Sequence, residues 1–424
     1  MLPLDEGAVE RLAAGSPDWV SEKRAEGFKL YQKLDMPDPR AEEWRYVELN
    51  FDIAEFMVPE GPGDPLAADT ELDGSFVDMA GRAVVIDGHC VDITSDGGPT
   101  FVSTRTAIAD HAEVAQRVIG RGIAPDLDRF SAAHHAFGSD GVFLHVPANT
   151  TADAPYYIDV QATTPGTITF PRISILVEDN ADAAVVVHYR SPEGSILVVP
   201  QIEADVAGRL SLTAVQEWGP QTTGISQLRM TAERDASLHL GEVGLGGVLA
   251  RLHLTMELNG RGSTGKVSGL YFGDSEQVLD YRAFMNHRAP NTNSDMFLKG
   301  AVEDDADSVF TGLIRIEPEA QRVNAYQTNR NLVLSDGAEA QSVPNLEILA
   351  NDVKCGHAST VGPLDEEQRY YLMSRGLERK RADRLQVRGF FEEALKRLPT
   401  QALAAPVRER VNAKYIAAQE EGRV

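Results

Sequence analysis

LVEDNADAAVVV (residues 176–187) is the first of four segments with one pattern: an apolar strand, acidic or amide residues, a small residue, and another apolar strand. The other three are IEADVAGRLSL (202–212), MTAERDASLHL (230–240) and MELNGRGSTGKV (256–267), and the four start about 26 to 28 residues apart. Looser copies follow more closely spaced, at 302–314, 316–326, 334–343 and 349–359. A unit that recurs in this way is typical of stacked coils.

Short strand-like runs divided by Gly, Asp, Asn and Pro continue for about 210 residues from Gly141, without a helical period of useful length. Runs of this kind form sandwiches, barrels or solenoids. The recurring unit favours a parallel β-helix, whose coils bend at small or left-handed-tolerant residues and stack their apolar positions. We therefore expect a mainly β fold.

The sequence pattern changes on both sides of this strand-rich region. Residues 1–140 predict helices within 1–35, a hairpin over Arg82–Ile93 with its turn at Asp87-Gly88, and a helix over about Leu127–Phe137. After Gly362, three amphipathic helices are expected, starting near Glu366, before Val387 and near Pro406. The predicted units are an N-terminal α+β domain (1–140), a β-helix core (141–362) and a C-terminal helical domain (363–424).

The bulk properties exclude several classes of partner. The 424 residues carry a formal charge of −24, which disfavours binding to nucleic acid and to anionic lipid. Two cysteines in so long a chain give no disulfide framework, and no long apolar run or signal layout is present. We expect a cytoplasmic protein without a membrane segment. Basic clusters near the C-terminus are interpreted as a solvated helix face.

Familiar catalytic motifs are missing or defective. GRGSTGKV (260–267) departs from a phosphate-binding loop because Val267 stands where a hydroxyl must bind Mg²⁺, and strand rather than helix follows it, so we expect a turn between coils. The adjacent His134 and His135 point about 100° apart on a helix and make a poor metal clamp. Cys90, in the hairpin, is expected to be an inert buried thiol.

Cys355 and His357 form the one pair that suggests chemistry. In an extended chain residues i and i+2 share a face, so a thiol and an imidazole lie side by side. Both ligate iron–sulfur clusters, iron or zinc, but two ligands do not close a tetrahedral site. Either the pair borrows ligands from another subunit, or Cys355 is buried beside a hydrogen-bonded histidine.

The run NRNLVLSDGAEAQSVPNLEILANDVKCGHASTVGPLDEEQRYYLMSRGL (329–377) closely resembles the C-terminal signature of the SufD family, part of the SUF iron–sulfur cluster assembly machinery. VFTGLIRIEPEAQRVNAYQTNRN (309–331) and PRAEEWRYVEL (39–49) look like the same family. The resemblance implies a right-handed parallel β-helix flanked by an N-terminal domain and a C-terminal helical domain.

The resemblance also implies function and partners. It predicts a non-catalytic scaffold that pairs with a SufB-like paralogue through the β-helix and docks a SufC-like ATPase. For the isolated chain, a homodimer is the alternative to this pairing. A transient iron–sulfur cluster would lie at the SufB–SufD interface, with His357 and, less directly, Cys355 as candidates, and no tightly bound cofactor in the isolated chain. The candidates for contacting the ATPase are Tyr371, Arg375, Gly376, Phe390 and Phe391.

Three alternatives stay open. A stand-alone β-helix enzyme would use Cys355 as nucleophile and His357 as base, although no orienting third group is apparent. A carbohydrate-binding solenoid would need an aromatic-lined groove, and aromatic residues make up only 7% of the chain. The SufB-type paralogue is disfavoured by Lys354-Cys355-Gly356-His357 in place of a glutamate-rich pattern, and by Asn329 where a cysteine is expected.

Overall fold

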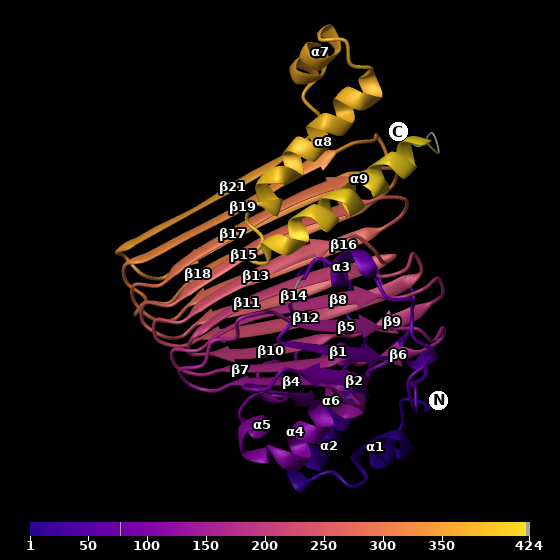
Figure 1. Ribbon diagram of the computed structural model, residues 1–424, viewed down its shortest axis with the longest axis vertical. Helices are drawn as coiled ribbons and strands as arrows, with labels where there is room; N and C mark the ends of the chain where they lie inside the picture. The colour runs from indigo at the N-terminus through magenta and orange to yellow at the C-terminus, as the bar shows by residue number, and fades with distance from the viewer. Residues whose placement is uncertain (77, 421–424) are drawn as a thin grey trace.

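The computed structural model describes residues 1–76 and 78–420, and its centre is a parallel β-solenoid (Figure 1). The mainly β fold predicted from the recurring unit is confirmed, with helices at the N-terminal and C-terminal ends. Two long sheets, ten-stranded and eleven-stranded in the described residues, form the walls of the solenoid.

Strands of the two walls alternate along the chain. The ten-stranded sheet has the spatial order β2 (His89–Ser95), β1 (Gly81–Ile86), β5 (Tyr156–Gln161), β8 (Asp182–Arg190), β11 (Arg209–Glu217), β13 (Ser237–Gly244), β15 (Thr264–Gly273), β17 (Asn293–Val302), β19 (Val323–Val333) and β21 (Val353–Gly362). The eleven-stranded sheet runs β20 (Glu339–Ile348), β18 (Asp307–Ile316), β16 (Val278–His287), β14 (Leu249–Leu258), β12 (Thr222–Ala232), β10 (Gln201–Val206), β7 (Arg172–Val177), β4 (Gly141–Val146) and β3 (Thr100–Ser103), with β6 (Ile168–Thr169) and β9 (Ile196–Val198) at its side.

The register explains why the repeat looks irregular in sequence. Positions 210, 238, 265, 294, 325 and 355 form one column of paired residues, so a coil takes 27 to 31 residues. The four regular segments all cover the same corner, from the eleven-stranded to the ten-stranded sheet. The later segments alternate between the two corners of each coil, and their spacing in the sequence is therefore shorter.

Residues with a left-handed backbone conformation form several of these corners, as the Asn, Asp and Gly content of the turns predicts. Asn180, Asp235 and Asn291 have positive φ angles of 54°, 56° and 60° and lie between β7 and β8, β12 and β13, and β16 and β17. Asn and Asp tolerate this conformation better than other residues with a side chain. The look-alike phosphate loop is one such corner, with Gly262 at φ 80° before β15, so the predicted turn is confirmed.

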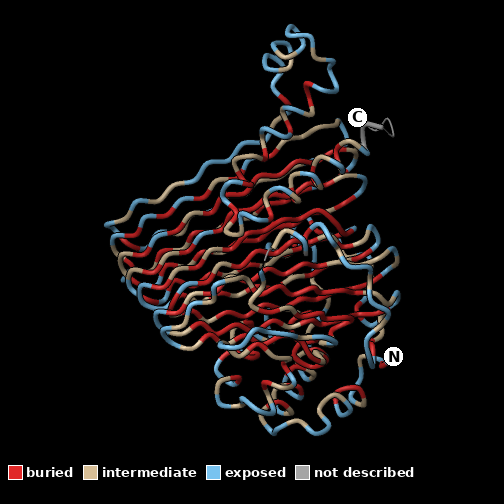
Figure 2. The backbone as a smooth tube through the Cα atoms, viewed as in Figure 1, coloured by how far each residue is buried: buried red, intermediate tan, exposed pale blue. Residues whose placement is uncertain are grey.

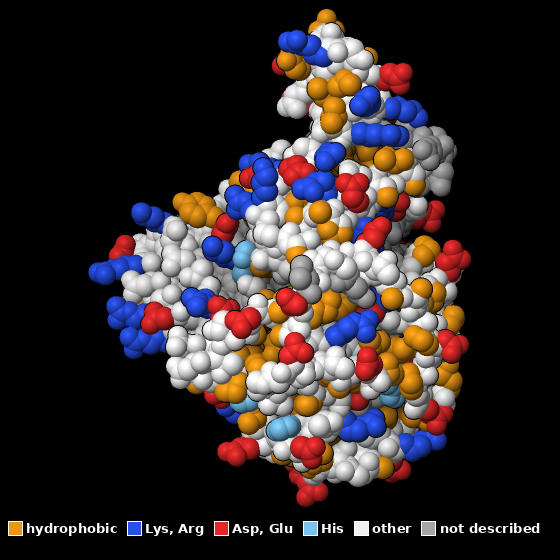
Figure 3. Space-filling view, in the orientation of Figure 1, with side chains coloured by type: hydrophobic (Ala, Val, Ile, Leu, Met, Phe, Trp, Pro, Cys, Tyr) orange, Lys and Arg blue, Asp and Glu red, His pale blue; other side chains and the backbone are white. Residues whose placement is uncertain are grey.

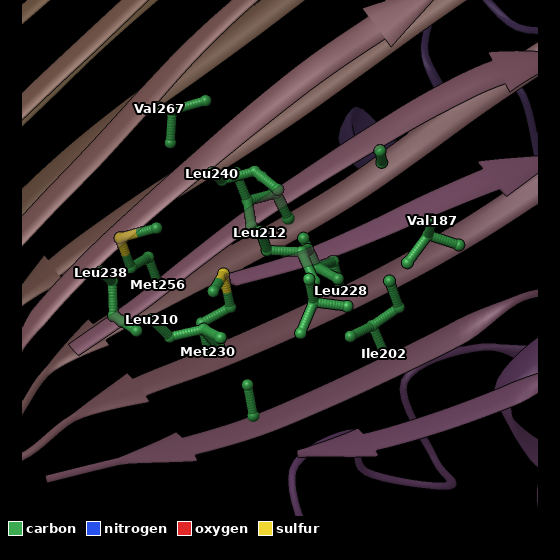
Figure 4. Packing of buried hydrophobic residues seen from close by; sticks show 14 of the residues in the cluster. Val187, Ile202, Leu210, Leu212, Leu228, Met230, Leu238, Leu240, Met256 and Val267 are labelled. Carbon is green, nitrogen blue, oxygen red and sulfur yellow. The ribbon is translucent and has the colours of Figure 1, made fainter. Parts of the chain in front are cut away.

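Apolar side chains fill the space between the two sheets (Figure 4). Along β13, Leu238 and Leu240 point into this lumen, while Val243 belongs to a second cluster on the outer face. The alternation follows from the two-residue period of a strand. The inward residues of each coil thus stack on those of the next coil, and these side chains alone fill the core.

The N-terminal segment closes one end of the solenoid (Figure 1). Its helices are α1 (Glu6–Ala13), α2 (Asp18–Lys33), α3 (Thr70–Asp73), α4 (Thr104–Asp110), α5 (Ala112–Val118) and α6 (Arg129–Phe137), with short 3₁₀ turns η1 (Glu42–Trp44) and η2 (Ile53–Glu55). The predicted hairpin is present, with β1 and β2 antiparallel and Asp87 and Gly88 at positive φ. Because β1 pairs with β5 and β3 with β4, both sheets begin before residue 141. The domain limits at 141 and 363 stay a prediction.

The C-terminal helices follow the last strand. They are α7 (Glu366–Ser374), α8 (Arg379–Leu395), η3 (Gln401–Leu403) and α9 (Ala404–Glu420). Helices α8 and α9 cover part of the outer face of the ten-stranded sheet. Val387, Phe391 and Val411 of α8 and α9 pack with Val243 and Phe272 of the sheet. Lys and Arg side chains gather along these helices (Figure 3), and α7 extends past the last coil (Figure 1). Within the described residues, no helix combines the length and the apolar character that crossing a membrane requires.

Candidate functional site at the open end of the solenoid

The last strands of both sheets, β20 and β21, lie at the C-terminal edge of the solenoid. Residues of the inner strands β17 and β18 are mostly buried, whereas no residue of β20 or β21 is (Figure 2). Ile348, Leu349 and Val361 are 41%, 47% and 43% exposed at this end. Unpaired strand edges beside exposed apolar side chains are a template for pairing with another chain.

Cys355 and His357 lie on β21, where the sequence places them. The register pairs Cys355 with Ala325 and His357 with Gln327 of β19. Cys355 is half-buried and packs against the apolar cluster of the lumen. His357, two residues on, is on the same face of the strand and is exposed. Both side chains therefore belong to the rim of the lumen at its open end.

Polar groups lie in the coil next to His357, on the neighbouring strands β19 and β20. Gln327 is buried, and its Nε2 donates a hydrogen bond of 3.1 Å to the carbonyl of Asn345 on β20, which ties the two sheets together. Its Oε1 is buried without a partner in the described residues. A Cβ on Gly312 would come within 2.2 Å of that oxygen, so glycine makes the close approach possible. The lumen becomes polar as it opens.

The chemistry of the pair favours binding over catalysis. Burial raises the pKa of the Cys355 thiol, which lowers the thiolate fraction that a nucleophile needs. No hydrogen bond joins Cys355 to His357 in the described part of the chain. The one group of three or more metal-ligating residues among the described residues lies elsewhere. A tetrahedral iron centre here would need further ligands from a second chain.

The candidate docking residues divide into two groups. Tyr371, Arg375 and Gly376 are exposed on α7 and at its end, with the Arg375 guanidinium 5.2 Å from the centre of the Tyr371 ring. Gly376 ends the helix at φ 89°, as predicted from the sequence. Phe390 is half-buried, and Phe391 is 2% exposed between α8 and the sheet. Phe391 therefore attaches α8 to the solenoid and is not available to a partner.

The other cysteine and histidine candidates are structural. His135 is buried, its Nε2 lies 3.0 Å from the carbonyl of Ile123, and burial lowers its pKa to about 3. His134 is also buried and contacts the carbonyl of Pro171 through Nε2. Cys90 is only partly buried, although the sequence predicts a buried thiol; burial still raises its pKa to about 12, which agrees with an inert thiol.

One cluster was not predicted from the sequence. Asp69, His188 and Glu217 have side-chain ligand atoms within 4.8 Å of one another on the outer face of the ten-stranded sheet. Arg410 of α9 lies between the carboxylates, with Nη1 2.6 and 2.7 Å from the two Glu217 oxygens and Nη2 2.5 Å from Asp69. A guanidinium already supplies the positive charge, so the cluster anchors α9. These residues are 341 positions apart at most, and no local motif marks them.

Comparisons with known proteins agree with this architecture. Residues 160–390 match the family model described as "SUF system FeS cluster assembly, SufBD core domain". A SufBD family protein of iron–sulfur cluster assembly from Mycobacterium tuberculosis is 34% identical over 304 residues, covering 70% of this chain and 75% of that protein. SufD of Bacillus subtilis is 26% identical over 91% of this chain and 92% of its own length, and a SufBD family protein of Staphylococcus aureus is 24% identical over 93% and 90%. The chain belongs to the SufBD family of iron–sulfur cluster assembly proteins, with SufD-like relatives along nearly its whole length.

Proposed function

We propose that this chain is a scaffold subunit of the SufD type, cytoplasmic and without catalytic activity of its own, which pairs end to end with a SufB-like paralogue. A nascent iron–sulfur cluster would be held where the two chains meet. The observation that carries the proposal is the open solenoid end, where two unpaired strand edges, exposed apolar residues and the Cys355–His357 pair coincide.

The ligand count supports an interface rather than a site inside one chain. His357 offers an exposed imidazole and Cys355 a half-buried thiol, so this chain supplies at most two donors at the rim. Clusters take most of their ligands from thiolates. A partner that brings its own cysteines to the same edge would complete the set.

We further propose that a SufC-like ATPase contacts α7. None of the residues of α7 is buried, and Tyr370, Tyr371 and Met373 are 75%, 56% and 43% exposed. The helix is nevertheless fixed in direction, because Arg369 donates a hydrogen bond of 2.6 Å to Asp383 on α8. An exposed aromatic helix on a rigid support is suited to receive a partner.

The site is tested by purifying the chain together with SufB-like and SufC-like proteins and measuring iron and sulfide per complex. His357→Ala should lower cluster content several-fold, and Cys355→Ala should lower it less, because His357 is the exposed donor. His111→Ala is the control, since His111 is an exposed histidine in the N-terminal cap. Equal cluster content in His357→Ala and wild-type complexes would contradict the proposed ligand role.

A further inference from the structure

A cleft in the N-terminal cap lies far along the chain from the proposed cluster site. The smaller of two adjoining pockets, about 40 Å³ and partly open, is lined by residues of α2, α4, the end of α6 and the start of β7, and we call it the inner cavity. An outer cleft of about 600 Å³ shares four lining residues with it, among them Arg24 and Ser139. The inner space is large enough for a few water molecules or one small oxyanion.

The charge of the cleft is opposite to that of the chain. Five basic side chains line the two spaces, Arg11, Lys23, Arg24, Arg105 and Arg172, against the two carboxylates of Glu60 and Asp140. In a chain with a net charge of −24, this is an unusual local excess of positive charge. Glu60 is already occupied, since its carboxylate lies 2.5 Å from the terminal ammonium.

Arg24 carries its charge into the protein without a carboxylate partner. Its Nη1 and Nη2 donate to the carbonyls of Ala136 and Gly138 at 2.9 and 2.6 Å, and no carboxylate pairs with it within residues 1–76 and 78–420, whereas Arg172 and Lys23 feel the charge of Glu203. Burial, with the nearby charges of Arg172 and Arg105, lowers the pKa of Arg24 to about 10. A buried, uncompensated cation is costly, and an anion in the cavity would relieve that cost.

Three residues that line the inner cavity carry a buried hydrogen-bond donor without a partner in the described chain. These donors are Trp19 Nε1, Arg24 Nε and Thr104 Oγ1, all buried atoms. Arg24 and Thr104 are only 8% and 5% exposed. The indole and guanidinium N–H groups can donate but not accept, so a group that fills the cavity must present acceptor oxygens to them. Neutral water meets this need only in part, whereas an oxyanion also balances the charge.

We propose that this cleft binds a small anionic molecule, with one oxyanion group, phosphate or carboxylate, held in the inner cavity by Trp19, Arg24 and Thr104. The outer cleft receives the rest of the molecule, beside Arg11 and Arg105. The oxyanion in the inner cavity is recognised by hydrogen-bond donors, and the rest of the ligand by the positive charges of the outer cleft. The site belongs to the N-terminal cap and does not depend on the proposed cluster site.

The test is calorimetric titration of the full-length chain with sodium phosphate and, separately, sodium acetate at constant ionic strength; tryptophan fluorescence, compared between the wild-type chain and Trp19→Phe, is a second readout. We expect saturable binding of one molecule per chain, and the two salts distinguish a phosphate from a carboxylate ligand. Thr104→Val removes one donor while keeping the shape, Trp19→Phe removes another with a smaller aromatic ring, and each should weaken binding about tenfold. A thermal melt of each variant confirms that it is folded.

Arg117→Gln is the matched control. Arg117 on α5 is 53% exposed and pairs with Glu178 at 2.7 Å, so its loss changes the overall charge but not the cleft. Binding in this variant should equal wild type. The proposal is overturned if neither salt binds saturably, which would mean that the cavity holds water only, or if Arg117→Gln weakens binding as much as the cleft variants do.

Discussion

Glu242 shows what burial inside the solenoid does to a single ionisable group. It lies on β13 with the same alternation as Leu238 and Leu240, and therefore faces the lumen. Burial raises the pKa of its carboxyl to about 8. Tyr189 and Tyr281 are close enough that the Glu242 charge also contributes to raising their pKa values. The protonated acid is therefore the form that fits the lumen near neutral pH.

Glu242→Gln should stabilise the protein at alkaline pH. Between the ordinary glutamate pKa and about pH 8, the folded chain holds a proton that the unfolded chain has released, so stability falls as pH rises through this window. The amide removes this loss, on the order of 5 kcal/mol at full extent. Thermal unfolding from about pH 5 to about pH 8 measures it. The exposed Glu233→Gln should keep the wild-type pH profile, and an unchanged slope in Glu242→Gln would contradict the assignment.

Single residues differ in how far the sequence could predict them. Cys355 and His357 were found because their i, i+2 spacing is local, and the structure places both at the rim of the lumen. No local sequence pattern identifies Gln327 or the unpartnered donors of the N-terminal cleft. Their burial and missing partners arise only when distant elements meet, as Thr104 of α4 and Arg24 of α2 do.

At the scale of elements, α9 depends on one ion-pair cluster for part of its attachment. Arg410 bridges Asp69, which precedes α3, and Glu217 at the end of β11. Burial opposes ionisation of both carboxyls. It is outweighed at Asp69 by the Leu72 backbone hydrogen bond and by Arg410, and at Glu217 by the His188 hydrogen bond and the Arg410 charge, so both pKa values are lowered. The cluster stabilises the fold above the ordinary carboxyl pKa and loses its effect as pH falls through the lowered values.

Arg410→Met should loosen α9 by about 2 kcal/mol or more, because it leaves two partly buried carboxylates without their cation. Hydrogen exchange of the amides in residues 404–418 should become faster, with little change in β11 and β13. Arg408→Met is the control, since Arg408 pairs with Glu392 on α8 and does not touch the sheet. If the α9 amides exchange as slowly in Arg410→Met as in the wild-type protein, the Arg410 cluster does not contribute to holding the helix, and apolar packing attaches it.

The elements themselves were largely predictable, and their spatial pairing was not. Asp365 followed by Gln368 predicted the start of α7, and the Asp87-Gly88 turn predicted the β1–β2 hairpin. That β1 continues the ten-stranded sheet beside β5 could not be predicted, because nothing in its sequence identifies a neighbour some 75 residues away. Parallel pairing is set by stacking in three dimensions rather than by local turns.

At the scale of the molecule, the open end predicts association of the isolated chain. Val361 is 43% exposed on the edge strand β21, and Val361→Glu would place a charge in any interface formed there. Sedimentation should show a dimer for the wild-type chain at high concentration and a monomer for the variant. Val91→Glu, on the exposed strand β2 in the N-terminal hairpin, should leave the dimer intact. Loss of the dimer in Val91→Glu alone would place the interface at the other end.

The two ends of the solenoid differ, and this limits how far assembly can proceed. Helices gather at the end where the chain starts, although β2 remains a partly exposed edge strand of the ten-stranded sheet there, while β20 and β21 are the edge strands of the other end (Figure 1). A solenoid open at both ends would add units in line and grow into a fibre. If two chains join through β20 and β21, one joining event uses both of these edges, and the proposed contact is then closed at two solenoids.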